Sequence, residues 1–470
     1  MVFSSFTFLF YFLPIFLLVY FLFPAVGRNA VLFGASLLFY FYGVREHPAY
    51  LLLILVSVFG NYMAARLIAA CRQESWRRVW LLAGMTWNIG SLFWFKYLDF
   101  LSANMNALLK RMGMESSIPA VNLPLPIGIS FYTFQISSYL LDVYWKKVPV
   151  ERSILTLGTY LCMFPQLIAG PIVTYSQVQA RMQFRIHSYG NVEEGLREFT
   201  IGLALKVLIA NRVGSLWTQM GTIGYDSISC PLAWLGIAAF TLQIYFDFYG
   251  YSLMARGLGL IMGFQFPDNF RNPYLARSMT EFWRRWHMTL GGWFREYVYI
   301  PLGGNRHHPY RNLFFVWMLT GLWHGASWNF VLWGFFLFLL LLLEKRGLAA
   351  VFDRLPFLGH LYMLAVIPLS WLVFAVTDLG QLVTYLSRLF PFFRQPGSAA
   401  NVFQGDFAKY AVAYFLSLAA AVFCCTGIPR KLYEKRKDTF LVTFGLLILF
   451  WASVYCMYLG LDDPFLYYQF

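Results

Sequence analysis

The sequence predicts an all-α protein that crosses a membrane many times, and three observations support this. The 470 residues are 59% hydrophobic and only 12% charged, whereas a soluble globular domain carries about 25% charged residues. Apolar runs at 6–25, 49–65 and 440–459 reach the roughly 17–25 residues needed to cross a hydrocarbon core. These runs are continuous rather than alternating, so they favour helices over the strands of a β-barrel.

The net charge of +14 sits mainly in short loops between apolar runs. Lys and Arg in such loops set topology and contact anionic lipid headgroups, so the charge does not indicate a nucleic-acid partner. Four basic clusters are predicted to be cytoplasmic, at 66–78, 146–152, 345–354 and 430–437. Counting spans from these clusters places both termini outside the cytoplasm. An even number of crossings follows, ten or twelve, within a single integral membrane domain over 1–470.

The middle of the chain is less regular. Residues 163–190 and 263–311 combine Pro, Gly and Arg with apolar residues, and broken helices at membrane depth are tolerated only around protein or a water-filled cavity. Both stretches are therefore predicted to be re-entrant or interfacial. Residues 379–407 are polar enough for an external loop or a surface helix. The six cysteines lack CxxC spacing, which predicts buried thiols and no metal or disulfide framework.

His324 is the first candidate catalytic residue. It lies within the apolar stretch 312–343, where an ionisable side chain is costly and indicates function. A neutral imidazole can take a proton from a hydroxyl group, which is the general-base step of acyl transfer to an alcohol. Gly321 and Gly325 are predicted to leave room for a substrate beside it. The alternative is a structural histidine that bonds to a neighbouring helix.

A second histidine, His287, lies in the motif Glu-Phe-Trp-Arg-Arg-Trp-His over 281–287. On a continuous helix Arg284 and His287 would be neighbours at i, i+3. The guanidinium groups of Arg284 and Arg285 could bind the phosphates of an acyl donor. The alternative is an amphipathic helix whose Trp and Arg side chains hold lipid headgroups.

Asp247 lies in an apolar run between Tyr245 and Tyr249. An intramembrane carboxylate implies a partner, for which the sequence suggests an Arg of the segment 271–295, or else a purely structural ion pair. No HExxH, P-loop or dinucleotide motif is present, and Ser130 lacks the GxSxG setting of a nucleophile.

Several segments together resemble the membrane-bound O-acyltransferase (MBOAT) family, and within it the bacterial alginate O-acetyltransferase branch. The segments are Glu-Phe-Trp-Arg-Arg-Trp-His at 281–287, Tyr-Ile-Pro-Leu-Gly-Gly-Asn-Arg at 299–306, Gly-Leu-Trp-His-Gly at 321–325, Tyr-Phe-Asp-Phe-Tyr-Gly-Tyr-Ser at 245–252 and Pro-Phe-Leu-Tyr-Tyr-Gln-Phe at 464–470. One position departs from the branch, because Leu253 stands where a carboxylate is usual.

The resemblance implies a family fold of about a dozen helices around a central tunnel, with His324 as the catalytic histidine and His287 as a second one. It implies transfer of a short acyl group, for example acetyl, from acetyl-CoA or an acyl-carrier protein. No tightly bound cofactor is expected. The acceptor would be alginate or another exopolysaccharide outside the inner membrane of a bacterium, reached through a partner with an SGNH-type hydrolase fold. The residues expected to bind substrate or donor are Arg284, Arg285, Trp286, Asp247, Trp323 and Asn329.

Two other functions remain open from the residues alone. A transporter would use Asp247 and His324 as a proton or ion path, and it predicts internal repeats and further acidic residues within spans. A structural scaffold of a secretion complex would leave His324 unexplained. Neither repeats nor such acids are evident in the sequence.

Overall fold

A computed structural model describes residues 1–114, 117–168, 170–393, 405–460 and 466 of the chain. The secondary structure of these residues consists of helices joined by turns and loops, with no strand. The predicted all-α class is confirmed. The helices form two compact units, one comprising 1–196 and 255–267 and the other 197–254 and 268–470.

The first unit begins with η1 (Thr7–Phe12), α1 (Leu13–Leu22), α2 (Arg28–Gly43) and α3 (Ala49–Ala70). It continues with α4 (Glu74–Arg111), α5 (Ile129–Tyr144), α6 (Ile154–Cys162), α7 (Phe164–Leu167) and α8 (Tyr175–Gln183). Helix α4 packs against both α3 and α5. Asn61 and Asn88 exchange two amide hydrogen bonds of 2.8 Å between α3 and α4, so these buried polar groups satisfy each other.

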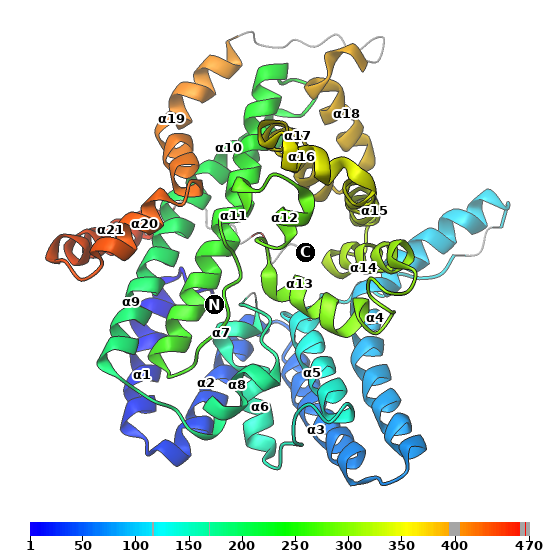
Figure 1. The fold of residues 1–470 in the computed structure, drawn as a ribbon, viewed down its shortest axis with the longest axis vertical. Helices are drawn as coiled ribbons and strands as arrows, with labels where there is room; N and C mark the ends of the chain where they lie inside the picture. Colours follow the sequence, from blue (N-terminus) through cyan, green and yellow to red (C-terminus); the bar gives the residue numbers. More distant parts are fainter. Residues whose placement is uncertain (115–116, 169, 394–404, 461–465, 467–470) are drawn as a thin grey trace. The chain divides into compact units, whose positions relative to one another are not determined.

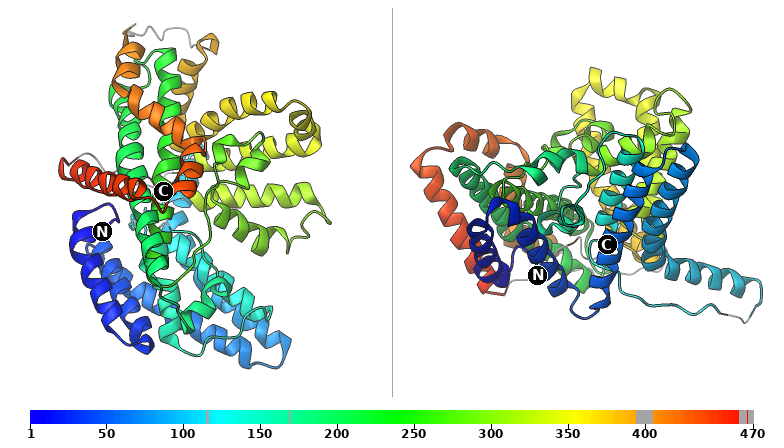
Figure 2. Two further views of the ribbon diagram at one scale, coloured as in Figure 1. Left: turned by 60° about the vertical axis from the view of Figure 1, so that its left-hand side comes forward. Right: turned by 90° about the horizontal axis from the view of Figure 1, so that it is seen from below.

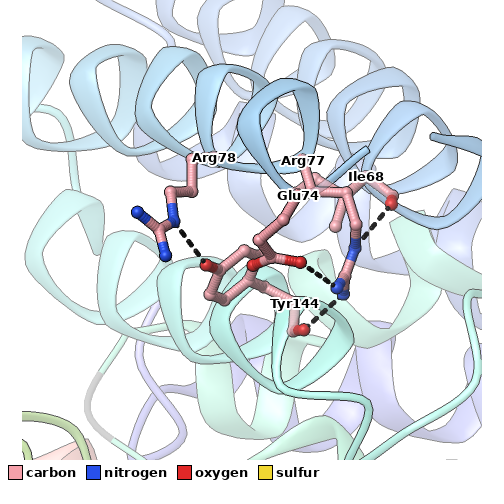
Figure 3. A network of polar contacts seen from close by, with 5 residues as sticks. All are labelled: Ile68, Glu74, Arg77, Arg78 and Tyr144. Atoms are coloured by element: carbon pink, nitrogen blue, oxygen red, sulfur yellow. Dashed lines mark hydrogen bonds and ion pairs between the residues drawn. The ribbon is translucent and has the colours of Figure 1, made fainter. Parts of the chain in front are cut away.

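Arg77 joins three helix ends of this unit, as Figure 3 shows. Its guanidinium donates to the carbonyl oxygens of Ile68 and Tyr144 and forms an ion pair of 2.8 Å with Glu74. Carbonyl oxygens at helix C-termini lack intrahelical donors, and Arg77 supplies them at the ends of α3 and α5. The basic cluster at 66–78 therefore contributes to packing as well as to charge.

The second unit contains α10 (Asn211–Ile223), most of α11 (Cys230–Ile261), α12 (Met279–Trp283), α13 (Met288–Phe294), α14 (Pro309–His324) and α15 (Trp328–Leu343). It also contains α16 (Ala349–Arg354), α17 (Pro356–Ala375), α18 (Leu379–Leu389), α19 (Asp406–Cys425), α20 (Ile428–Arg436) and α21 (Phe440–Tyr458). Its apolar core is lined by α10, α11, α15 and α17. Helices α14 and α15, yellow-green in Figure 2, lie side by side.

Among the residues that the structure describes, six helical segments are long and apolar enough to span a membrane: Ala49–Ala70, Tyr189–Ile223, Cys230–Ile261, Pro356–Ala375, Asp406–Cys425 and Phe440–Tyr458. The segment Tyr189–Ile223 joins α9 (Tyr189–Ala204), the π-helical turn η3 (Leu205–Ala210) and α10. Thr7–Leu22 is a shorter apolar helix. The polytopic character is confirmed, while the topology and the count of ten or twelve crossings stay predictions.

The two stretches predicted to be irregular are built mainly of short helices and non-helical chain where the structure describes them. Residues 263–311 form short helices and turns, including α12, α13 and the π-helical turn η5 (Arg295–Tyr299). The described residues of 163–190 hold only α7, α8 and the start of α9 besides extended chain. In the predicted external loop 379–407, residues 379–389 form α18, and residues 394–404 are not described. The placement of these stretches relative to a membrane stays a prediction.

Candidate functional site

His287 lies at a break between two short helices of the second unit. Helix α12 ends at Trp283, α13 starts at Met288, and His287 adopts the left-handed conformation with φ 42° and ψ 52°. The break arises because this segment pairs with the preceding chain: Met288 N donates to the Asn269 carbonyl and Arg271 N to the Arg285 carbonyl, both at 2.9 Å. Arg284 and His287 therefore do not lie on one continuous helix. A left-handed residue other than glycine is uncommon.

Asn269 sets the orientation of the His287 ring. Its side-chain oxygen lies 3.0 Å from His287 Nδ1 and also accepts hydrogen bonds from the hydroxyl and backbone N–H of Thr289. Its amide nitrogen donates to the Ser252 hydroxyl at 3.2 Å. Because the Asn269 oxygen can only accept, Nδ1 of His287 is the protonated nitrogen and Nε2 is the basic one.

His287 is only 2% exposed and lies outside the helices long enough to span the membrane. Burial penalises the charged imidazolium, and it lowers the pKa of His287 to about 3. The side chain is therefore neutral at physiological pH. A neutral ring in this tautomer accepts a proton or a hydrogen bond at Nε2.

His324 ends α14 and is surrounded by aromatic rings. The ring centroids of Trp323, Trp333 and Phe374 lie 4.9, 5.2 and 5.1 Å from that of His324. After three residues the chain turns into α15, so the apolar stretch 312–343 forms a helical hairpin rather than one span. Each arm has 16 residues, about 24 Å of helix. His324 thus sits at the closed end of the hairpin and is 8% exposed.

The glycines beside His324 serve packing and do not leave room for a substrate, so that prediction is wrong. A Cβ on Gly321 would lie 2.4 Å from the Phe330 carbonyl oxygen, and one on Gly325 would lie 2.1 Å from the Phe330 ring. A Cβ on Gly334 of α15 would lie 2.5 Å from the Trp317 carbonyl oxygen of α14. Small residues let two helices approach to backbone contact, which is what closes the hairpin.

Trp323 links the two histidines. Its ring centroid lies 6.3 Å from that of His287 and 4.9 Å from that of His324. The two imidazole rings are therefore no more than about 11 Å apart, the sum of these two distances. That separation is below the ~15 Å beyond which a single bound acyl group could not bridge both groups. The structure thus brings together the two histidines singled out in the sequence and Trp323.

Of the three residues before His287, only Arg284 is exposed. Arg285 is held by an ion pair with Glu281 and donates to the Asn272 carbonyl at 3.4 Å. Trp286 is 4% exposed, and its ring packs against Phe270, Phe282 and Trp371 within the core. Among these residues Arg284 is the best placed for a charged ligand.

Asp247 forms a buried ion pair with Lys206, not with an Arg of 271–295 as the sequence suggested. Lys206 Nζ lies 2.7 Å from Asp247 Oδ1 and donates to Asn211 Oδ1 at 2.7 Å. The other carboxylate oxygen of Asp247 accepts a bond from Leu466 N at 2.9 Å. Lys206 reaches the carboxylate because it lies in the π-helical turn η3, whose backbone approaches Gly250 of α11. Both oxygens of the carboxylate are therefore paired within the core.

The approach of α9 to α11 makes this pair possible. A Cβ on Gly202 would lie 2.5 Å from the Gly250 carbonyl oxygen, and one on Gly250 would lie 2.6 Å from that of Gly202. Such paired glycines allow close helix contact. Leu253, the residue that departs from the alginate branch, is buried beside Gly202.

Asn329 contacts the end of α17. Its side-chain nitrogen donates to the carbonyl oxygens of Val373 and Phe374 at 3.2 and 3.0 Å, which are among those a helix C-terminus leaves without donors. The structure therefore places Asn329 in helix packing behind Phe374 and away from an open binding surface. Asn329 is fully buried.

Sequence reasoning missed three residues that hold this region. A lysine within the apolar run around Lys206 was a usable signal, since an intramembrane cation needs a partner. Glu344 accepts bonds from the backbone of Met279 and Thr280 at the start of α12, although its place beside a basic loop is typical of a solvated charge. Asn269 carried no signal. In the described part of the chain, no cluster of three His, Cys, Asp or Glu could hold a metal ion.

Residues 147–375 match the MBOAT, membrane-bound O-acyltransferase family. The chain is 34% identical to the probable alginate O-acetylase AlgI of Azotobacter vinelandii and 34% identical to that of Pseudomonas putida, over the full length of all three proteins. It is 36% identical to the peptidoglycan O-acetyltransferase of Helicobacter pylori, over 71% of this chain and 68% of the relative.

This chain belongs to the membrane-bound O-acyltransferase family. The resemblance seen in the motifs is confirmed, and the protein is a multi-pass membrane O-acyltransferase. Acyl transfer in this family needs no tightly bound cofactor. The transporter and scaffold alternatives are not favoured, since the matches extend over the full length of two relatives named as O-acetylases.

Proposed function

We propose that this protein transfers an acetyl group, or another short acyl group, from a cytoplasmic donor toward a polysaccharide outside the cytoplasm. The observation that carries the proposal is the pair of buried imidazoles joined by Trp323 within about 11 Å, the sum of the two ring distances of 6.3 and 4.9 Å. The names of the full-length relatives support a polysaccharide acceptor such as alginate or another exopolysaccharide.

In the proposed reaction His324 takes the proton of an acceptor hydroxyl as its oxygen attacks the acyl carbonyl. The new C–O bond forms, the C–S bond of the thioester breaks, and the departing thiolate receives the proton. The tautomer set by Asn269 leaves Nε2 of His287 as an acceptor. His287 would therefore accept a hydrogen bond from the substrate and orient it, rather than polarise the carbonyl.

The donor would be acetyl-CoA or an acyl-carrier protein, with exposed Arg284 contacting its phosphates and Arg285 held beside it by Glu281. Trp323 would line the acyl position between the histidines. An SGNH-type partner would receive the acyl group and complete its transfer to the polymer. The protein would reside in the inner membrane of a bacterium.

We also propose that residues 1–470 act as one integral membrane domain. Two of the three boundaries between the compact units, at 196/197 and 254/255, fall inside α9 and α11. Boundaries between independent domains fall in exposed linkers instead.

The test is transfer of radiolabel from acetyl-CoA to extracellular polymer by the protein reconstituted in vesicles together with its SGNH-type partner. His324→Ala should lower the transfer rate by about a thousandfold, as expected for loss of a general base. His360→Ala is the matched control, since His360 is an exposed histidine of α17. Equal rates for wild type and His324→Ala would contradict the proposal. Label that crosses the membrane without joining any acceptor would favour a transporter.

A further inference from the structure

A second polar cluster lies in the first unit, far along the chain from the histidine pair. Tyr20 at the end of α1 is fully buried, and its hydroxyl donates to the Met262 carbonyl at 2.8 Å. The same hydroxyl oxygen accepts a bond from Arg185 Nη1 at 3.0 Å and lies 3.4 Å from His187 Nε2. Arg28, the first residue of α2, approaches His187 Nδ1 at 3.0 Å.

These contacts assign the proton on His187. A guanidinium can only donate, so Nδ1 of His187 accepts from Arg28, and Nε2 carries the proton that faces Tyr20. Burial, followed by the charges of Arg28 and Arg185, lowers the pKa of His187. The cluster therefore carries two fixed positive charges and a neutral imidazole.

No carboxylate balances these charges. Among the residues that the structure describes, neither Arg28 nor Arg185 has an Asp or Glu within ion-pairing distance. Arg185 is anchored by Asn29 and by the ring of Phe264, whose centroid lies 4.4 Å from its guanidinium carbon. Half-buried guanidinium groups without a counter-ion form a site for an anion, and their planar fork fits phosphate oxygens.

The surroundings of the cluster are apolar and exposed. Residues 184–188 are not helical, and along them exposed Phe184 and Ile186 alternate with the inward Arg185 and His187. Phe184 is 73% exposed and Ile186 53%. Gly263, at φ 85°, allows this segment to pack closely, because a Cβ there would lie 3.1 Å from that of Arg185.

Further exposed apolar side chains lie at the end of α1 and just after it, with Leu22 at 74% and Val26 at 95%. Thr7–Leu22 is an apolar helix, and we place its end, with Leu22 and Val26, at the edge of the hydrocarbon. A ligand bound at this cluster would contact the guanidinium groups on one side and the exposed apolar side chains on the other. A soluble phosphate would use only the first of these, whereas a phospholipid would use both.

We propose that Arg28 and Arg185 form a binding site for the phosphate of an anionic phospholipid, with Tyr20 holding Arg185 in place. The acyl chains of the lipid lie along Leu22, Val26, Phe184 and Ile186. A lipid with a zwitterionic headgroup binds less well, because its ammonium group is repelled by the two guanidinium groups. The site is independent of acyl transfer and is tested without it.

The test is native mass spectrometry of the full-length protein released from nanodiscs that contain phosphatidylglycerol and phosphatidylcholine. Arg28→Gln/Arg185→Gln should lower the preference for phosphatidylglycerol by about thirtyfold, the effect of two cations near an anionic surface. Arg28→Gln alone should lower it by about fivefold. The single variant keeps the bonds of Arg185 to Tyr20 and Asn29, so it remains informative if the double variant does not fold.

The matched control is Arg72→Gln/Arg111→Gln, which removes two exposed cations of the same unit. Its preference for phosphatidylglycerol should stay at the wild-type value. If the control loses as much preference for phosphatidylglycerol as the Arg28 variants do, the effect comes from net charge alone. That result would overturn the proposed binding site. Displacement of bound phosphatidylglycerol by free coenzyme A, abolished in Arg28→Gln, would assign the cluster to a soluble phosphate and also overturn the proposal.

Discussion

The two histidines of the second unit are held by different kinds of contact. The polar side of the site consists of His287, Asn269, Ser252 and Thr289. The aromatic side consists of His324, Trp323, Trp333 and Phe374. Hydrogen bonds fix both the position of an imidazole and the nitrogen that carries its proton. Ring contacts fix the position of His324, the residue proposed as the base, by shape.

The largest effects should come from removing either imidazole of the site. We expect His287→Ala to lower the rate of acyl transfer by about a thousandfold, within the range for a group that handles a proton or orients the reactants. Radiolabel transfer from acetyl-CoA measures it. His308→Ala, an exposed histidine, should retain wild-type transfer. If His287→Ala remains active, His324 and its aromatic neighbours must carry out the transfer without His287.

The largest effect on the free energy of unfolding should come from breaking the buried ion pair between Lys206 and Asp247. Lys206→Met leaves the Asp247 carboxylate buried without its cation, and breaking a buried pair in this way costs about 3–5 kcal/mol. The double variant Lys206→Met/Asp247→Leu should recover most of this loss, because no charge is then left unpaired. Thermal unfolding of the purified protein, followed by loss of monodisperse material, measures both. A double variant no better than the single one would refute the pairing.

The proton on His287 can be tested through Asn269. Asn269→Asp puts a carboxylate beside Nδ1, which favours the imidazolium and raises the pKa of His287 from about 3 toward its ordinary range. Transfer should then fall as the pH drops from about 7 to about 5, where the wild-type His287 stays neutral. At a pH of about 8 the variant should be within about tenfold of wild type, the loss expected for one altered hydrogen bond.

Identical pH–rate profiles for wild type and Asn269→Asp would show that the proton on His287 plays no part in the reaction. The profile separates this role from a merely structural one, because a general loss of packing would lower the rate equally at every pH. Asn269→Ser, which removes the amide without adding a charge, is the control.

The smallest effect is expected on the aromatic side. Phe374→Leu removes one of three rings around His324 but keeps an apolar side chain of similar volume, so it should cost less than about 1.5 kcal/mol. Transfer should fall by no more than about tenfold. A loss as large as that of His287→Ala would mean that the ring contacts determine the chemistry of His324 and not only its place.

The fold class was evident in the sequence because a chain surrounded by lipid must consist largely of apolar residues. Long apolar runs with few charges have few stable structures in lipid, and the helices Thr7–Leu22, α3 and α21 lie close to their predicted limits. The motifs around His287 and His324 likewise indicated the candidate site. Their side chains are costly to bury, so their presence among apolar residues is itself a signal.

The sequence by itself determined that the chain is an all-α membrane protein and that His287 and His324 stand out in it. Only the tertiary structure decided the breaks at His287 and after His324, the partner of Asp247 and the bond from Asn269 to His287. Asn269 and His287 are 18 positions apart in the chain, and Lys206 and Asp247 are 41 positions apart. Local periodicity reports only on residues within a few turns of one helix, so such pairings cannot be read from it.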